Sequence, residues 1–366
     1  MVNRMILANV LHRPVRTAVS ILAVAIEVIM VMLVVGLTNG LVQESAKRVE
    51  GVGADLLVQP PGASFLFGLT QAPMPLRIGE KLAEIPHVLY VAPTLFQPYT
   101  SGGLSIIYGI DLPSFNQVTG GFVYHGGGPF TGPYDVLVDD WYAKANHVRV
   151  GQNLSLLNHD FRVAGIVEHG KGSRLFIPLE TAQDLSGARD KASIFWVRCT
   201  DPAYTNQVVE AIHQLLPKYQ TTPIKEYMSL MTSNNLPGLN AFVNAMIAIA
   251  LGIGFLVIFL SMYTTITERT REIGILKSLG ASKGYIINII LRESSLLALI
   301  GIGLGWLGAM IGRRVFLGAF PTLSIDLTVG WAFRAALLAL VGSVLGAVYP
   351  ALRAAQLDPV DALAYE

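Results

Sequence analysis

The side chains best suited to metal or acid–base chemistry are scattered along this sequence of 366 residues. None of the seven histidines stands in an HxxxH or HExxH pair, and the single cysteine, Cys199, has no second cysteine at the spacing of a zinc or redox motif. No nucleophile–base set is evident either. We therefore predict no catalytic residue, no metal site and no intrachain disulfide.

One stretch imitates a phosphate-binding loop. Residues Gly165 to Lys171 read GIVEHGK, which matches the start of the GxxxxGK[ST] motif. The next residue is Gly172 instead of the serine or threonine that would hold magnesium, and the RLFIPL that follows predicts a strand, not a helix whose N-terminus could bind phosphate. We predict a β-turn here and no ATP-hydrolysing site on this chain.

Glu27 is an ionisable residue near the middle of an apolar stretch, Ala18 to Leu37. A carboxylate at the bilayer centre costs at least ~2.5 kcal/mol, so Glu27 must be protonated, paired, or directed into a cavity. Two interpretations remain open: contact with a substrate or proton, and a hydrogen bond across a helix–helix interface. Met30 lies one turn further on the same face and suits a cavity for apolar cargo. Glu27 and Met30 form our candidate intramembrane site.

A charged segment, Thr267 to Leu291, separates two other apolar stretches. Ile273, Leu276 and Leu279 recur at three-residue spacing and predict a short amphipathic helix. Gly280 is placed to end it, and Ser282 can cap the helix that follows. Such a helix can dock into a groove of a partner protein, or it can be a solvated connection on the lipid surface. Its charged side chains are Glu268, Arg269, Arg271, Glu272 and Lys277.

Membrane helices must position these residues. Only 14% of the side chains are charged and the mean hydropathy is +0.52, whereas soluble domains carry about 25% charged residues. We predict an α-helical membrane protein with four transmembrane helices. The first helix and a stalk cover 18–50, and the other spans cover 238–266, 286–312 and 329–350, the last one ending at Pro350. The remaining membrane-side segments are an interfacial helix at 1–17 broken at Pro14, a coupling segment at 267–285, a short external loop at 313–328 and a tail at 351–366.

Glycines at GxxxG spacing recur in the last two predicted spans. Small residues at this spacing allow helix backbones to approach closely. We therefore expect helix packing at Gly301, Gly305, Gly308, Gly312, Gly342 and Gly346.

Residues 51–237 have the composition of a globular domain, with glycine, proline and charged residues throughout. Alternating strand and helix patterns predict a mixed α/β domain with two lobes, inserted between the first and second membrane helices. The predicted strands are Asp55–Gln59, Val88–Val91, Ser105–Ile110, Val136–Val138, Phe161–Val167 and Ile194–Arg198. The predicted helices are Ile78–Ile85, Asp140–Asn146, Leu179–Leu185 and Ala203–Leu216.

Basic residues are concentrated on the side of the membrane that carries both termini. That side has Arg4, Arg13, Arg16, Arg269, Arg271, Lys277, Lys283, Arg292 and Arg353, and the short opposite segments have Arg313, Arg314 and Arg334. The positive-inside rule predicts a multi-pass protein of the cytoplasmic (inner) membrane with cytoplasmic N- and C-termini and an extracytoplasmic large domain. The net charge of +1 gives no indication of a nucleic-acid partner.

The sequence resembles the MacB/FtsX-like family of ABC-transporter permeases over its whole length. Residues 268–282, ERTREIGILKSLGAS, resemble the cytoplasmic coupling segment of the family, and residues 349–363, YPALRAAQLDPVDAL, resemble its C-terminal motif. Shorter stretches resemble its periplasmic core domain: VGQ at 150–152, FRVAGI at 161–166 and FIPL at 176–179. The chain differs from MacB in lacking a fused ATPase, as do the split relatives.

This resemblance implies a permease that forms a dimer with a second copy of itself and binds two copies of a separate ABC ATPase. ATP and magnesium would be bound by the ATPase, and no cofactor by this chain. Ile273, Leu276 and Leu279 would fill a groove of the ATPase, next to the Gly280 turn, and Glu268, Arg271, Glu272 and Lys277 would fix the register. Membrane lipid and a periplasmic adaptor protein are further partners to expect.

The resemblance implies ATP-driven export or extraction of an amphiphile from the outer leaflet or periplasm, with toxin, antibiotic, haem and lipid-like compounds all open. The alternative is an FtsX-type mechanotransmitting permease that activates an extracytoplasmic hydrolase. A large, two-lobed outer domain favours transport. A membrane enzyme would need a catalytic set, which the residues do not provide.

Overall fold

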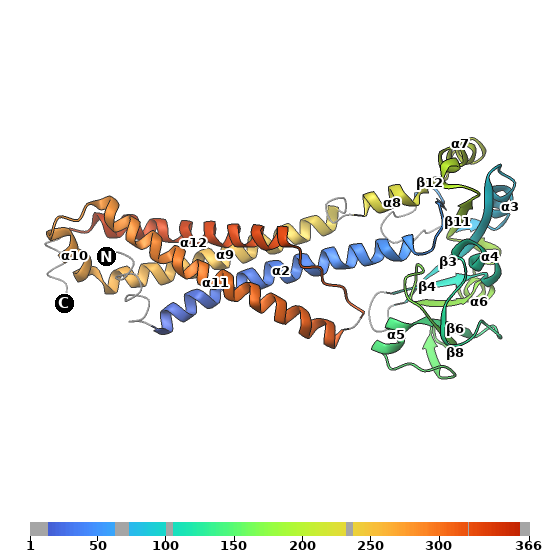
Figure 1. Ribbon diagram of the computed structural model, residues 1–366, viewed down its shortest axis with the longest axis horizontal. Helices are drawn as coiled ribbons and strands as arrows, with labels where there is room; N and C mark the ends of the chain where they lie inside the picture. The colour runs from blue at the N-terminus through green and yellow to red at the C-terminus, as the bar shows by residue number, and fades with distance from the viewer. Residues whose placement is uncertain (1–13, 63–72, 100–104, 232–236, 321, 359–366) are drawn as a thin grey trace. The chain divides into compact units, whose positions relative to one another are not determined.

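The computed structural model describes residues 14–62, 73–99, 105–231, 237–320 and 322–358 (Figure 1). Contacts divide the chain into two compact units. The first, called here the membrane unit, comprises Met1–Gly40, Pro237–Ala319 and Ile325–Glu366. The second, called here the inserted domain, comprises Leu41–Leu236 and Phe320–Ser324. The predicted interfacial helix lies mostly outside the described residues, as do the last residues of the predicted tail.

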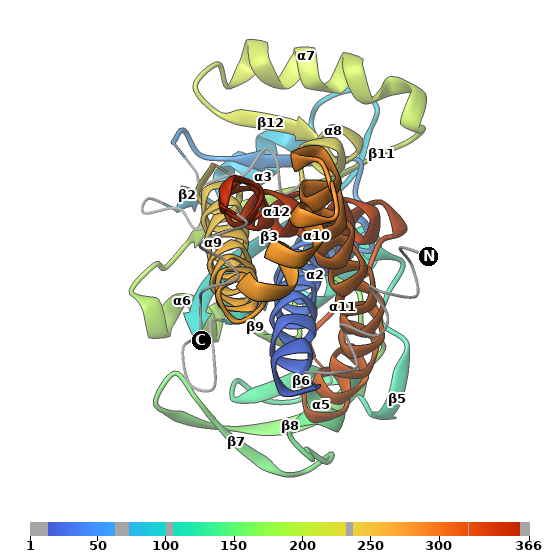
Figure 2. The ribbon, with the colours of Figure 1, turned by 90° about the vertical axis from the view of Figure 1, so that its left-hand side faces the viewer.

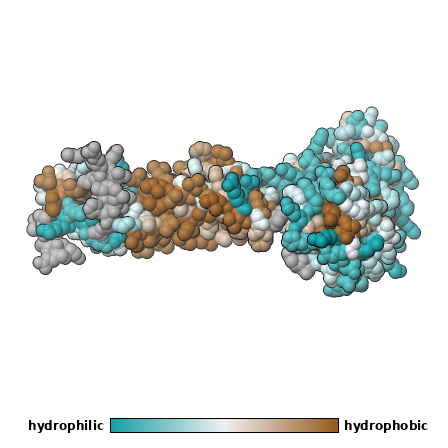
Figure 3. Space-filling model, turned by 60° about the horizontal axis from the view of Figure 1, so that its bottom comes forward, coloured by the Kyte–Doolittle hydropathy of each residue, from teal (hydrophilic) through white to brown (hydrophobic). Residues whose placement is uncertain are grey.

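The membrane unit is built from long apolar helices and one short helix (Figures 1 and 2). Among the described residues, four helices are long and apolar enough to cross a membrane, and Figure 3 shows hydrophobic residues over most of the middle of this bundle. The bounds are α2 Pro14–Glu50, α9 Pro237–Glu268, α10 Thr270–Ser278, α11 Lys283–Ala319 and α12 Val329–Gln356. The predicted four-helix membrane architecture is confirmed.

Glycine and serine allow these helices to pack closely. A Cβ added at Gly301 or Gly305 of α11 would lie 2.7 Å from the Cβ of Val24 or Val28 on α2, so a side chain at either glycine would force the helices apart. The hydroxyls of Ser20 and Ser261 lie 2.6 Å apart in the buried contact between α2 and α9. The helices therefore pack backbone to backbone and satisfy their buried polar groups with one another.

Two predicted ends of membrane helices differ from those in the structure. α11 continues beyond the predicted end at Gly312 to Ala319, with Arg313 Nε donating to the carbonyl oxygen of Ile325. α12 passes through Pro350 to Gln356, since a proline near a helix end removes a single hydrogen bond and neighbouring helices supply the packing.

The inserted domain is mixed α/β, as predicted. Its described strands form a ten-stranded sheet in the order β12-β1-β11-β3-β4-β9-β6-β8-β5, with β7 paired to β8. The pairs β4–β9 and β6–β8 are parallel and the others are antiparallel. A small second sheet pairs β2 with β10.

The strands of the inserted domain are β1 Leu56–Gln59, β2 Met74–Pro75, β3 Val88–Tyr99, β4 Ser105–Ile110, β5 Tyr124–Gly127, β6 Asp135–Asp139, β7 Asn153–Leu156, β8 His159–Val167, β9 Leu175–Pro178, β10 Lys191–Ala192, β11 Ile194–Cys199 and β12 Gln220–Pro223. The helices are α3 Arg77–Ala83, α4 Leu112–Thr119, α5 Asp140–Ala145, α6 Leu179–Ser186, α7 Thr205–Leu215 and α8 Ile224–Leu230, with a 3-10 turn at Pro202–Tyr204.

The two predicted lobes correspond to two hydrophobic cores on one continuous sheet. One core packs α3 and α7 against the β1 and β11 end, through residues such as Leu82, Ile212 and Phe195. The other packs α5 and α6 against β6, β8 and β9, through residues such as Phe161 and Ile177. The lobes are therefore joined by strand pairing.

Proline and turn chemistry account for the elements that the sequence pattern predicted wrongly. Strand β3 was expected to end at Val91, but it continues through Pro93 and Pro98, because the pairing with β11 and β4 outweighs two missing donors. Helix α4 was not predicted, although Asp111 caps it by accepting from the Ser114 N–H at 3.1 Å. The first three residues of the GIVEHGK stretch end β8, and the other four belong to the connection between β8 and β9.

Candidate functional site

The charged segment of the membrane unit folds into a short helix, α10, with a non-helical joint at each end. Arg269 separates α9 from α10 with φ −110° and ψ 19°. Gly280 ends the segment with φ 94°, a left-handed conformation that favours glycine. The Ser282 hydroxyl then accepts from the Tyr285 N–H at 3.2 Å and caps the start of α11. Both predicted turn residues thus occupy the positions that their chemistry favours.

Arg269 joins α10 to α11 through two carboxylates. Its Nε lies 3.1 Å from Oε2 of Glu272, and its Nη1 lies 3.5 Å from Oε2 of Glu293. Glu293 is buried near the start of α11, and the Arg269 side chain is 15% exposed. Since a partly buried pair is screened less than a surface pair, this contact holds α10 against α11.

Lys277 joins α10 to the end of α12. Its ammonium group donates to the carbonyl oxygen of Ala355 at 3.0 Å and also to that of Leu357. The last carbonyl groups of a helix have no partner within the helix and carry partial negative charge. Lys277 therefore supplies the missing donors for α12 and fixes α10 beside them.

Arg16 connects the start of α2 to the end of α9, next to α10. Its Nη2 lies 2.5 Å from Oε1 of Glu268, and its Nη1 donates to the Thr265 hydroxyl at 3.3 Å. Together with the contacts of Arg269 and Lys277, this pair links α10 and its joints to all four long helices. Figure 2 shows the end of the bundle at which α10 lies.

The apolar stripe predicted for docking is divided in the structure. Ile273 is buried in the core of the membrane unit and Leu276 packs against that core, because the stripe turns toward the adjacent α9 and α11. Leu279 is 79% exposed, and Ile275, which the pattern did not single out, is 44% exposed. The exposed residues of α10 and its C-terminal end are Arg271, Glu272, Ile275, Ser278 and Leu279, and the expectation that Ile273 fills a partner's groove is corrected.

The candidate intramembrane site lies between α2 and α9. Glu27 is 6% exposed, and a Cβ added at Gly254 of α9 would lie 1.9 Å from its Oε2. Gly254 thus makes the room in which the carboxyl group sits. Met30 is half-buried and packs against the same helical core. Neither residue is brought near the α10 contacts, so the two candidate sites are separate places in one unit.

The predicted glycine positions differ in how closely they pack. Gly346 of α12 meets the α9 backbone, where an added Cβ would lie 2.9 Å from the carbonyl oxygen of Phe255. Cβ atoms at Gly308 and Gly312 would meet the side-chain ends of Ile29 and Leu33. Gly342 makes only ordinary contact, at 3.6 Å from Leu251.

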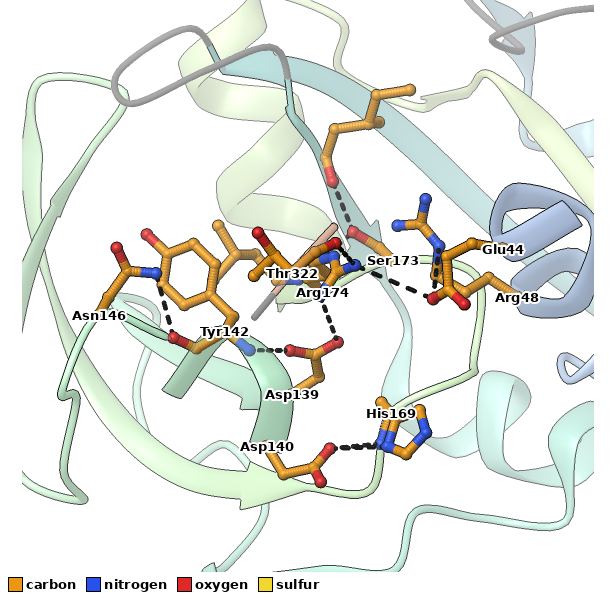
Figure 4. Close-up of polar contacts among 12 residues, drawn as sticks. Glu44, Arg48, Asp139, Asp140, Tyr142, Asn146, His169, Ser173, Arg174 and Thr322 are labelled. Carbon is orange, nitrogen blue, oxygen red and sulfur yellow. Dashed lines mark hydrogen bonds and ion pairs between the residues drawn. The ribbon is translucent and has the colours of Figure 1, made fainter. Parts of the chain in front are cut away.

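A buried ionic cluster in the inserted domain was not predicted (Figure 4). The Arg174 guanidinium lies 3.9 Å from Glu44 of the α2 stalk and 3.9 Å from Asp139, and it donates to the carbonyl oxygen of Thr322 at 2.9 Å. Arg48 approaches Glu44 at 3.8 Å. The cluster ties the last turns of α2 and the segment before α12 to strands β6 and β9.

Asp139 occupies the most buried position of this cluster. Burial raises the pKa of its carboxyl group to about 6, although the Tyr142 N–H, donating at 2.6 Å, and the nearby Arg174 lower it. On the other side of the cluster, His169 Nδ1 lies 3.0 Å from Asp140 Oδ1 and its ring stacks on Trp141. Asp139 is the last residue of a buried strand and caps the helix that follows, which is a pattern that sequence reasoning could have recognised.

The chain belongs to the family of MacB-like, FtsX-like ABC-transporter permeases. Residues 17–215, more than half of the chain, match the MacB-like periplasmic core domain. Residues 244–359 match the FtsX-like permease C-terminal domain. Both matched regions are permease domains, and they correspond to an inner-membrane protein with an extracytoplasmic domain, which is the inserted domain described above.

Curated relatives agree with this assignment. The macrolide export ATP-binding/permease protein MacB of Shewanella sp. (strain W3-18-1) is 27% identical over 395 residues, covering 99% of this chain and 60% of the relative. MacB of Nitrobacter winogradskyi is 32% identical, covering 58% of this chain and 35% of the relative. The uncharacterized ABC transporter permease YknZ of Bacillus subtilis is 31% identical, covering 53% of this chain and 45% of that protein. The chain thus spans 35% to 60% of the length of these relatives.

Proposed function

We propose that the chain is the permease subunit of an ABC transporter in which α10 transmits the movement of a separate ATPase. The observation that carries this proposal is the attachment of α10. It is held to the long helices by Arg269, Lys277 and the neighbouring Arg16–Glu268 pair, while Ile275 and Leu279 point outward. An outward surface on which apolar and charged side chains alternate, on a firmly held helix, suits a docking partner.

The transmission route that we propose follows α2. A force on α10 reaches the start of α2 through Glu268 and Arg16, and α2 is one uninterrupted helix from Pro14 to Glu50. Its last turns contact Arg174 of the extracytoplasmic domain through Glu44. ATP and magnesium are bound by the ATPase, two copies of which serve a dimer of this chain, and α10 and both termini face the cytoplasm.

The substrate class that we propose is an amphiphile taken from the outer leaflet or periplasm. The support is the family membership and the names of relatives, which include macrolide export and pyoverdine export proteins. Antibiotic, toxin, haem and lipid-like compounds all belong to this class. Glu27 and Met30 are the intramembrane residues proposed to meet it, and a periplasmic adaptor is a further proposed partner.

Purification of the tagged chain from its own membrane tests this function. We expect an ABC ATPase to co-purify and its ATP hydrolysis, measured in lipid nanodiscs, to be stimulated by at least one amphiphile class. Leu279→Asp should abolish co-purification by placing a charge on the docking surface. Leu215→Asp, at an exposed apolar site on α7, is the matched control and should retain the ATPase.

The two ways in which this experiment can fail have different meanings. If the ATPase co-purifies with Leu279→Asp as well as with Leu215→Asp, docking at α10 is contradicted. A stable ATPase complex that ignores every amphiphile would contradict transport and favour the signalling function, in which the same movement activates an extracytoplasmic hydrolase.

A further inference from the structure

Helix α2 ends against a loop of the inserted domain. The loop consists of residues 168–174, which connect β8 to β9, and it is called here the seat loop. It contains the last four residues of the GIVEHGK stretch, to which the proposed function gives no role. Residues 41–50 of α2 belong to the same compact unit as this loop. The contact between the helix end and the loop therefore lies within one unit.

Glycines let the helix end and the seat loop meet backbone to backbone. A Cβ added at Gly51, the residue after α2, would lie 2.0 Å from the carbonyl oxygen of Gly170. The Gly172 N–H donates to the carbonyl oxygen of Arg48 at 2.8 Å, which gives a partner to one of the last carbonyl groups of the helix. Gly172 has a φ of 80°, and a Cβ added there would lie 2.6 Å from the ring of Tyr108. A side chain at Gly51 or Gly172 would therefore disturb this contact.

Other residues of the seat loop are fixed to separate parts of the domain. Lys171 Nζ donates to the carbonyl oxygen of Thr119, at the end of α4, at 2.7 Å. The Ser173 hydroxyl donates to the carbonyl oxygen of Ile106 on β4. Arg174 meets the α2 stalk and β6 in the ionic cluster of Figure 4. Moving the loop would break these polar contacts together, and a segment held in this way opens rarely.

The seat loop holds α2 at two levels along the helix. Arg174 reaches Glu44, and the glycines of the loop meet the helix end at Gly51. Since each residue advances a helix by about 1.5 Å, the two levels lie about 10 Å apart. The Gly53 N–H also donates to the carbonyl oxygen of Glu50 at 2.9 Å and closes the turn after the helix. A helix held at one level can tilt about that point, whereas two levels oppose tilting as well as sliding.

We propose that the seat loop is a rigid joint, through which the end of α2 and the inserted domain move as one body. Glycines on either side of Val52 follow α2 directly, and this sequence by itself favours a hinge. In the structure Gly51 is packed against the loop, and Gly53 lies in a closed turn. Bending between the helix and the domain is therefore opposed at the place where the sequence would permit it.

The joint gives the seat loop a role in coupling. A movement of α2 enters the domain at this loop, from which Lys171 passes it to α4 and Ser173 passes it to β4. Gly51, Lys171 and Gly172 are then positioning residues for coupling, which act without contact with the ATPase or the substrate. This consequence rests on the proposed function, whereas the rigidity of the joint does not.

Hydrogen–deuterium exchange of the full chain in phosphatidylcholine nanodiscs tests the rigidity. We expect peptides covering residues 45–53 and 168–174 to exchange at least ten times more slowly than unstructured peptides of the same sequence. Gly172→Ala should raise the rate in both peptides at least threefold. Gly151→Ala is the matched control and should exchange like the wild type. Gly151 has a φ of 84° and meets nothing within 4 Å, so its substitution gives similar backbone strain without the packing defect.

A milder variant separates loosening of the joint from a general loss of structure. Lys171→Met keeps an unbranched side chain of similar length but removes the donor to Thr119, and it should raise exchange in residues 168–174. Exchange in β11, which lies in the other hydrophobic core of the domain, should stay unchanged in both seat-loop variants.

Three outcomes would overturn the rigid joint. Fast exchange of either peptide in the wild type would mean that the joint is mobile. Unchanged exchange in both Gly172→Ala and Lys171→Met would mean that the loop does not hold the helix end. With the ATPase bound, faster exchange in ATP and vanadate than without nucleotide would mean that the joint bends during the cycle. Because the first two measurements need no ATPase, their failure is distinguishable from failure of the proposed function.

The role in coupling has a test of its own. In the complex with the ATPase, Gly172→Ala should retain basal ATP hydrolysis and lose at least half of its stimulation by amphiphiles. Gly151→Ala should retain both. Full stimulation in Gly172→Ala would overturn the role of the seat loop in coupling.

Discussion

The buried Asp139 predicts a specific dependence of stability on pH. Its carboxyl group has a pKa of about 6 in the folded domain against 3.8 for an ordinary aspartate. Below pH 3.8 the folded and unfolded states both hold the proton. Between pH 3.8 and 6 the folded state holds more protons than the unfolded state, so stability falls as pH rises. Above pH 6 the full cost, about 3 kcal/mol, is present.

Asp139→Asn should remove this cost and keep the fold. An asparagine side chain can still accept from the Tyr142 N–H, so the cap of α5 is retained. We expect the stability advantage of the variant over the wild type to grow by about 2.4 kcal/mol between pH 4 and pH 7. The substitution also removes the Asp139 carboxylate that lies 3.9 Å from Arg174, and the loss of this ion pair lowers the stability of the variant. An increase in the stability advantage half as large as this would therefore still agree with the reasoning.

The assay is urea unfolding of the full chain in detergent, followed by tryptophan fluorescence at several pH values. Asp160→Asn, at an exposed position on β8, is the matched control, and its stability should run parallel to that of the wild type. Parallel curves for Asp139→Asn and the wild type would refute the argument, because they would mean that Asp139 takes up no extra proton on folding.

Three further predictions follow from packing and burial. Gly305→Ala should cost about 1–3 kcal/mol by forcing α2 from α11, whereas Gly303→Ala, which meets nothing within 4 Å, should be neutral in thermal unfolding. Gly254→Ala should destabilise the wild type much more than a Glu27→Ala background, because the clash is with the Glu27 carboxyl; equal effects in the two backgrounds would exclude that contact. Burial, with a smaller contribution from a nearby aspartate, raises the pKa of the Cys199 thiol to about 11, so iodoacetamide at pH 8 should modify the folded protein far more slowly than the unfolded one.

Local patterns predicted those parts of the fold that depend on neighbours in the sequence. The turn at Gly280 and the helix cap at Ser282 need only the residues beside them, and both are where the pattern placed them. Helix α12 was cut short at Pro350 because a proline rule derived from isolated helices ignores the packing of a bundle.

The short charged helix was predicted in position, but its orientation was not. Its apolar stripe marks a buried face, and the spacing of Ile273, Leu276 and Leu279 does not say whether that face meets the protein's own helices or a partner. The contacts that attach α10 were also beyond local patterns. Arg16 and Glu268 are 252 residues apart, and Lys277 and Leu357 are 80 residues apart.

The sequence by itself determined that this protein spans a membrane, that a mixed α/β domain follows its first helix, and that a charged helix separates its second and third spans. These features follow from composition and short periodicities, because burying an apolar face is required wherever the chain folds. Only the tertiary structure decided which side chains of α10 point outward, that Gly254 makes room for Glu27, and that Arg174 meets the α2 stalk. Those facts depend on which distant segments pack together, and that choice is made by the whole chain at once.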